Sequence, residues 1–167
     1  MVRPRYIICS EGRVIDQATK LISHFNVIDQ ITVSMQTSTV KTAEPRLVGL
    51  ALELSAVWMK EDESEKEVDY ETEVRLFSPG GDEPQVARLG TFRFGEHYYH
   101  RINMTIRPGP AGEESAVIEL REGMMRLECR IRPLGGGETD WISQDYLIPV
   151  KVNRPDSPEP QADSSGA

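Results

Sequence analysis

Alternation of polar and apolar residues with a period of two constrains this chain more than any other feature. Successive side chains of a β-strand point to opposite faces, so this alternation is typical of a half-buried strand. In Met124–Arg132 apolar residues alternate with charged ones, and Val68–Leu76 repeats the pattern. The alternation predicts an all-β fold.

Further segments have strand patterns and are separated by turns rich in glycine and proline. They are Arg5–Ser10, Leu21–Val33, Leu47–Met59, Gln85–Phe94, His97–Ile106, Ser115–Arg121 and Trp141–Val152. Leu47–Met59 has small or apolar residues on both faces, which is typical of a central strand, and Leu21–Val33 is long enough to contain a bend. About nine such strands predict a two-sheet antiparallel β-sandwich.

The 167 residues predict one domain, over residues 1–152, followed by a disordered tail. The tail, residues 153–167, has the sequence NRPDSPEPQADSSGA, in which proline, serine and acidic residues leave almost nothing to bury. Ser34–Pro45 is polar and rich in threonine, so we interpret it as a long loop. Loops of this length inside compact domains are often functional.

The net charge of −8 argues against binding to nucleic acid or to an anionic membrane, because both favour clustered Lys and Arg. Residues 1–9 contain no secretory signal, and no apolar run approaches the roughly 18 residues of a membrane-spanning helix. These features predict a cytoplasmic protein. Cys9 and Cys129 lie in apolar patterns, so we expect both to be buried and reduced.

The sequence has no nucleophile elbow, P-loop, dinucleotide-binding glycine motif, CxxC pair or HExxH motif. His97 and His100 have a spacing that suits a metal on a helix, but in a strand they point to opposite faces and cannot share one ion. We therefore predict no catalytic residues, no metal ligands and no cofactor. A calcium site built from Asp62, Asp82 and Asp140, which all fall in loops, is the alternative.

Charges are distributed unevenly along the chain. Lys60–Glu73 carries eight acidic residues and two lysines, whereas Pro84–Pro133 carries eight arginines, no lysine and six acidic residues. Arginine suits bidentate contacts with carboxylates and is common in protein interfaces. The predicted protein-binding residues are Arg101, Arg107, Arg126, Arg130 and Arg132.

Two interpretations of these arginines stay open. They form a docking face for an acidic partner or for the acidic segment of a second copy, or they pair across strands with Glu119 and Glu128.

Four segments of the chain form a recognisable pattern: Pro4–Cys9, Val14–Gln17, Lys20–Ile31 and the strand Met124–Ile131 after Gly123. By this pattern, which is clearest in the N-terminal half, the chain resembles a family of small bacterial proteins of unknown function. It implies a bacterial origin and a compact β-sandwich, and it supplies no activity. The polar positions that match the family pattern are Asp16, Asn26 and Asp29, which we expect to cap turns.

The leading hypothesis from the sequence is a non-enzymatic protein-binding module that docks through an arginine-rich sheet face or an open strand edge. Its expected partner is another protein, and a homodimer is compatible with the exposed edges of a sandwich. The alternatives are a sandwich that binds calcium or a small ligand through its end loops, a structural subunit of a larger assembly, and an enzyme whose site comes from scattered loop residues.

Overall fold

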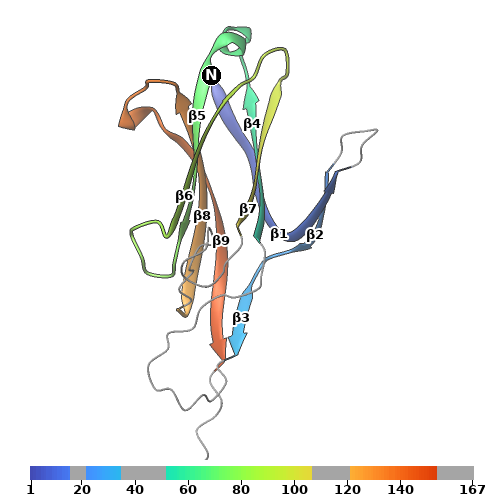
Figure 1. Cartoon of the computed structure of the whole chain (residues 1–167), viewed down its shortest axis with the longest axis vertical. Helices are drawn as coiled ribbons and strands as arrows, with labels where there is room; N and C mark the ends of the chain where they lie inside the picture. The colour runs from blue at the N-terminus through green and yellow to red at the C-terminus, as the bar shows by residue number, and fades with distance from the viewer. Residues whose placement is uncertain (16–21, 35–51, 107–120, 154–167) are drawn as a thin grey trace, which may run out of the picture.

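Nine strands form two sheets that pack face to face in the computed structural model, which describes residues 1–15, 22–34, 52–106 and 121–153 (Figure 1). One sheet contains β1 (Val2–Ile15), β2 (Ile22–Val27), β4 (Leu52–Lys60) and β7 (Tyr99–Ile106). The other contains β3 (Ile31–Ser34), β5 (Asp69–Phe77), β6 (Val86–Arg93), β8 (Gly123–Pro133) and β9 (Ile142–Asn153). The predicted all-β, two-sheet fold is confirmed.

The strand order is β2-β1-β4-β7 in the four-stranded sheet and β3-β9-β8-β5-β6 in the five-stranded sheet. Every pair is antiparallel except β3 and β9, which run parallel. The predicted strand Leu21–Val33 divides into β2 and β3, which belong to different sheets. The division occurs at residues 28–30, where Ile28 is buried and its N–H donates to the Cys9 carbonyl at 2.9 Å.

Several predicted features lie outside the described residues. They are the loop Ser34–Pro45 beyond its first residue, the strand Ser115–Arg121 up to residue 120, Arg107, Asp16, and the tail beyond Asn153. Short 3₁₀ helices at Glu63–Glu67 (η1) and Glu138–Asp140 (η2) are the helical elements of the described ranges. No helix within those ranges has the length and apolarity needed to span a bilayer.

The core lies between the sheets and is built from the inward residues of the central strands β4 and β8. Leu54 and Trp58 of β4 and Leu127 of β8 are fully buried. Ser55, on the opposite face of β4, is also fully buried, which confirms that both faces of this strand are covered. Both cysteines are buried and unpaired.

An aromatic cluster closes the end of the sandwich where the chain passes from β6 to β7. The His100 ring stacks on Phe92 with ring centroids 3.9 Å apart and an interplanar angle of 7°. Tyr70 packs against Phe92 and Phe94 in the same cluster. His97 is exposed and precedes β7, so it lies outside the strand that the sequence pattern predicted for both histidines.

The hairpin of β1 and β2 curves out of the four-stranded sheet (Figure 1). Ser10 is the last residue of β1 that pairs with β4, and beyond it β1 pairs with β2 alone. Asn26 adopts a left-handed backbone conformation with φ of 51°, and its amide donates to Glu11 at 2.9 Å. Asp29 lies in the bend between β2 and β3, whereas Asn26 lies within β2, so of these two positions Asp29 has the predicted place at a turn.

Candidate functional site

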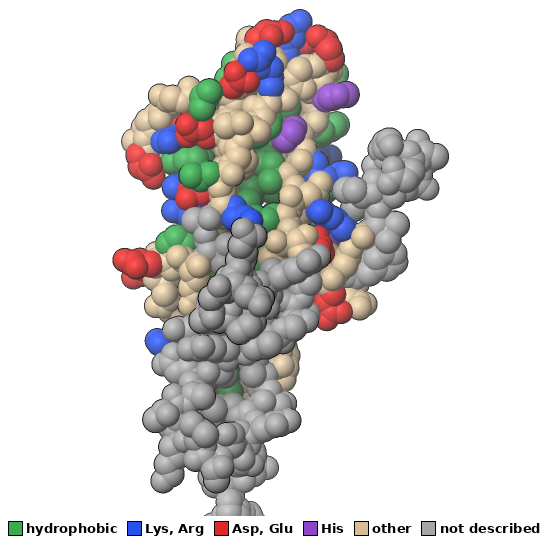
Figure 2. Space-filling model, viewed as in Figure 1, with side chains coloured by type: hydrophobic (Ala, Val, Ile, Leu, Met, Phe, Trp, Pro, Cys, Tyr) green, Lys and Arg blue, Asp and Glu red, His purple; other side chains and the backbone are tan. Residues whose placement is uncertain are grey.

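A row of cross-strand ion pairs runs along the outward face of the five-stranded sheet, which we call the ladder face. The sequence ETEVR of β5 lies antiparallel to ECRIR of β8, so charged residues alternate with uncharged ones along both strands and opposite charges face each other across them. The register aligns Glu71 with Arg132, Glu73 with Arg130, and Arg75 with Glu128. Figure 2 shows acidic, basic and hydrophobic side chains interspersed along the left side of the molecule, where this face lies in profile.

Each ion pair is a charge-assisted hydrogen bond of short length. The guanidinium Nε donates to a carboxylate oxygen at 2.6 Å in Arg130–Glu73, 2.7 Å in Arg132–Glu71 and 2.6 Å in Arg75–Glu128. The positive charge of β8 is therefore largely neutralised within the sheet. The surface is less positive than the arginine count of the sequence suggests.

Trp141, between η2 and β9, is held against two of these arginines. The guanidinium carbons of Arg130 and Arg132 lie 4.2 Å and 4.4 Å from the centroid of its ring. Its indole N–H donates to Glu138 at 3.1 Å. The hydrogen bond from Trp141, followed by that from Arg130, lowers the pKa of Glu138. These contacts fix the orientation of a partly exposed aromatic ring.

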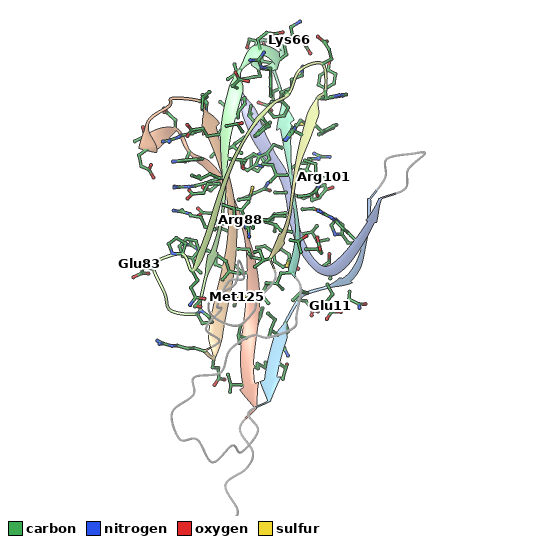
Figure 3. All side chains as sticks on the ribbon, in the orientation of Figure 1. Glu11, Lys66, Glu83, Arg88, Arg101 and Met125 are labelled. Atoms are coloured by element: carbon green, nitrogen blue, oxygen red, sulfur yellow. The ribbon has the colours of Figure 1, made fainter. Side chains whose placement is uncertain are left out.

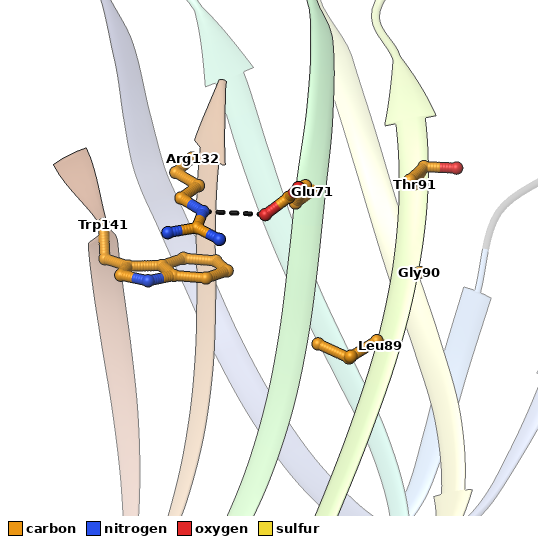
Figure 4. A pocket seen from close by; sticks show the side chains of 6 residues that line it. All are labelled: Glu71, Leu89, Gly90, Thr91, Arg132 and Trp141. Carbon is orange, nitrogen blue, oxygen red and sulfur yellow. Dashed lines mark hydrogen bonds and ion pairs between the residues drawn. The ribbon is translucent and has the colours of Figure 1, made fainter. Parts of the chain in front are cut away.

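A depression of about 510 Å³ opens beside this tryptophan (Figure 4). It is lined by Glu71, Leu89, Gly90, Thr91, Arg132 and Trp141. In Figure 4, Trp141 and Arg132 form one side and Leu89 of β6 stands opposite them. The Leu89 side chain is 79% exposed. The depression thus combines apolar walls with one ion pair, a combination that suits an apolar side chain with a polar neighbour.

The other end of the ladder face is more apolar. Arg126 lies over the ring of Phe77, with its guanidinium carbon 4.0 Å from the ring centroid. Met124 and Leu147 are 49% and 54% exposed. Arg126 forms no ion pair with any residue that the structure describes. This end therefore offers apolar side chains around Arg126, whose charge also acts on Asp145 of β9.

The structure separates the predicted arginines. Arg126, Arg130 and Arg132 share the ladder face, as their spacing in β8 predicted. Arg101 does not belong with them, because β7 is the edge strand of the four-stranded sheet (Figure 3). Arg107 lies outside the described residues.

The predicted acidic segment is likewise divided. Its first half forms η1, where Asp62 caps the helix by accepting a hydrogen bond from the Ser64 N–H. Its second half is the outward face of β5, whose Glu71 and Glu73 pair with β8. Cross-strand pairing of the arginines is therefore present, but with Glu71 and Glu73 in place of the expected Glu119 and Glu128, and Glu119 lies outside the described residues. Glu128 pairs with Arg75 of β5 instead of an arginine of its own strand.

The calcium site considered from the sequence is not assembled among the described residues. Among the described residues, no group of three or more His, Cys, Asp or Glu side chains is placed to hold a metal ion. Asp62 caps η1, and Asp140 accepts a hydrogen bond from the Gly137 N–H at 2.7 Å. These aspartates act in local turns.

Sequence reasoning did not single out Trp141, Leu89 or Leu147. The alternation along β9 places Trp141 and Leu147 on the same side as Ser143 and Asp145, so their outward position could have been predicted from the sequence. The depression could not have been predicted, because it depends on β6 lying next to β5.

Comparison with known proteins found no matching protein family and no matching curated relative.

Proposed function

We propose that this protein is a non-enzymatic protein-binding module of the bacterial cytoplasm and that it docks through the ladder face. The exposed hydrophobic side chains on that face are the observation that carries the proposal. Leu89 lies on the edge strand β6 opposite Glu73, and Met124 and Leu147 lie toward the end of the face where β8 begins. Single exposed hydrophobic residues are common on proteins, but several on one sheet face, together with Arg and Trp, match the composition of protein interfaces.

The charges of the ladder face are mostly paired, so we expect a partner to dock through complementary shape more than through long-range electrostatic attraction. Because the central arginines are paired with glutamates, they contribute little net field. Arg126, which forms no ion pair with a described residue, can meet a carboxylate of the partner. We therefore expect a partner surface that is mainly apolar and carries one acidic group opposite Arg126.

Trp141 is the expected centre of the binding energy near the depression. Trp and Arg dominate the energetics of many interfaces, especially where they are already ordered before binding. The contacts of Trp141 with Glu138 and the two arginines hold its ring in place. A partner side chain that enters between Trp141 and Leu89 meets a surface that needs little rearrangement.

The test uses one variant of the face and one matched control. Leu147→Asp combined with Arg126→Glu changes the ladder face, whereas Val27→Asp places a charge at an aliphatic residue of similar exposure in the four-stranded sheet. Circular dichroism and thermal melting establish that both variants are folded. The immobilised full chain is then compared with each variant for retention of proteins from bacterial extract and of its own soluble form.

We expect a protein retained by the wild type and by Val27→Asp but not by the double variant. Retention of the soluble chain itself with the same dependence would identify a homodimer as the association. If the double variant keeps every association of the wild type, the ladder face is not the docking surface.

A further inference from the structure

A second polar cluster lies on the outward face of the four-stranded sheet, where the β1–β2 hairpin curves. We call it the hairpin cluster, and its residues are Ser10, Arg13, His24, Glu53, Arg101 and Thr105. Figure 3 shows Arg101 on β7, on the side that faces the hairpin. Figure 2 shows basic and acidic side chains gathered on that side of the molecule.

Coiling of β1 brings the cluster together. Ser10 pairs with Glu53 and therefore shares its face, whereas Arg13 is three residues further along. In a flat strand Arg13 would point to the opposite face. Its Nε nevertheless lies 3.4 Å from a Glu53 oxygen, so the strand coils between the two positions. His24, opposite Arg13 on β2, follows the same curve and places its Nδ1 3.1 Å from the Ser10 hydroxyl.

The cluster contains more positive than negative charge. Glu53 is its carboxylate, and this group already accepts hydrogen bonds from the Thr105 hydroxyl at 2.8 Å and 2.9 Å. Arg13 and Arg101 are both present, and Arg101 forms no ion pair with a described residue; its guanidinium contacts the Tyr6 hydroxyl at 3.5 Å. With neutral His24, two cations face one anion.

Two guanidinium N–H groups in the cluster are buried without an acceptor. Arg13 Nη1 and Arg101 Nε have no hydrogen-bond partner within the described structure. Buried donors of charged groups nearly always have an acceptor, because a buried donor without a hydrogen bond destabilises the folded protein. Both arginines lie close enough to His24 to lower its pKa, in addition to the larger effect of burial. The two unsatisfied donors therefore belong to one electrostatic site.

We propose that the hairpin cluster binds a phosphate group, held by Arg13 and Arg101 with His24 as a further donor. Guanidinium groups match the oxygens of phosphate in geometry and charge. His24 gains a proton as the anion binds, so the excess charge of the cluster rises from one to two and matches a phosphate dianion. Phosphate should therefore bind the wild type and should raise the pKa of His24.

NMR titration of the full chain with inorganic phosphate, at constant ionic strength maintained with sodium chloride, tests the proposal. The histidine signals are followed, and His24→Gln assigns the relevant one among the three histidines. We expect saturable shifts that include His24 and an upward shift of its pKa. Arg13→Gln and Arg101→Gln should each weaken binding by about tenfold or more. Arg126→Gln, on the other sheet, is the matched control and should leave the affinity unchanged.

A variant that gains affinity separates a binding role from a structural one. Glu53→Gln removes the anion that competes for Arg13, so phosphate should bind this variant more tightly than the wild type. Damage to the fold would not produce tighter binding. Shifts that do not saturate, or that Arg126→Gln changes as much as Arg101→Gln does, would overturn the proposal. Acetate that binds as tightly as phosphate would overturn the phosphate assignment.

Discussion

Replacing Arg75 with methionine should destabilise the protein much more than the same replacement of Arg93. Both arginines pair with an acidic residue across the strands of one sheet, but their environments differ. The side chains of Arg75 and its partner Glu128 are 21% and 8% exposed, whereas those of Arg93 and Asp69 are 47% and 45% exposed. Methionine keeps much of the apolar stem of arginine and removes the charge.

The expected loss in the free energy of unfolding depends on the acidic partner that remains after each replacement. Arg75→Met leaves the Glu128 carboxylate buried without its cation, and breaking a buried pair in this way costs about 3–5 kcal/mol. Because Arg75 is partly exposed, we expect the lower end, about 3 kcal/mol. Asp145 lies opposite Glu128 on β9, and burial together with the Glu128 charge raises its pKa, so repulsion adds to the loss. Arg93→Met should cost much less, because solvent screens exposed ion pairs.

Urea denaturation at pH 7, followed by circular dichroism, measures the free energy of unfolding of both variants. For a chain of this size, the loss in Arg75→Met corresponds to a melting temperature lower by about 6–12 °C. Adding Glu128→Gln to Arg75→Met should recover at least about 1 kcal/mol, because it removes the uncompensated buried charge. Equal losses for Arg75→Met and Arg93→Met, or no recovery in the double variant, would refute the reasoning.

Three further predictions concern single side chains. Burial raises the pKa of Cys9 to about 12 and of Cys129 to about 11, so both thiols should resist Ellman's reagent at pH 8 until urea unfolds the chain; rapid reaction of the native protein would contradict this. Burial, followed by the charge of His97, lowers the pKa of His100, so the folded state binds fewer protons than the unfolded chain. The free energy of unfolding should therefore fall as the pH drops below about 6.5, and His100→Phe should make this fall less steep. Trp58 is fully buried whereas Trp141 is partly exposed beside two cations, so iodide should quench the fluorescence of Trp141, and Trp141→Phe should abolish most of the quenching.

The two proposed surfaces lie on opposite sheets and differ in character. The ladder face has its central charges paired within the sheet and exposes apolar side chains on β6, β8 and β9. The hairpin cluster has buried guanidinium groups that lack acceptors. Because their test variants share no residue except the control Arg126, failure of one proposal leaves the other intact.

Much of the fold could be predicted because strand periodicity is a local property. The predicted segments Val68–Leu76 and Met124–Arg132 correspond to β5 and β8 within one residue at each end. The outward position of the β8 arginines followed from the same alternation. The division of Leu21–Val33 between two sheets was harder to predict, because the alternation of polar and apolar residues does not indicate which strand each half pairs with.

The candidate sites were predicted less completely than the fold. The arginine-rich surface was recognised, but its neutralisation by Glu71 and Glu73 depends on β5 lying beside β8. The hairpin cluster was not predicted, because its contact between Arg13 and Glu53 requires a coiled strand. Residues three apart in a regular strand point away from each other, but this rule does not apply to His97 and His100, because His97 precedes β7.

The sequence by itself determined the all-β fold class, the faces of its regular strands and the burial of its cysteines. Each follows from the alternation of polar and apolar residues along an extended backbone. The tertiary structure alone decided which strands are neighbours, that Arg101 stands apart from the β8 arginines, and where β1 coils. These features depend on contacts between residues far apart in the chain, and periodicity within a strand carries no information about its neighbours.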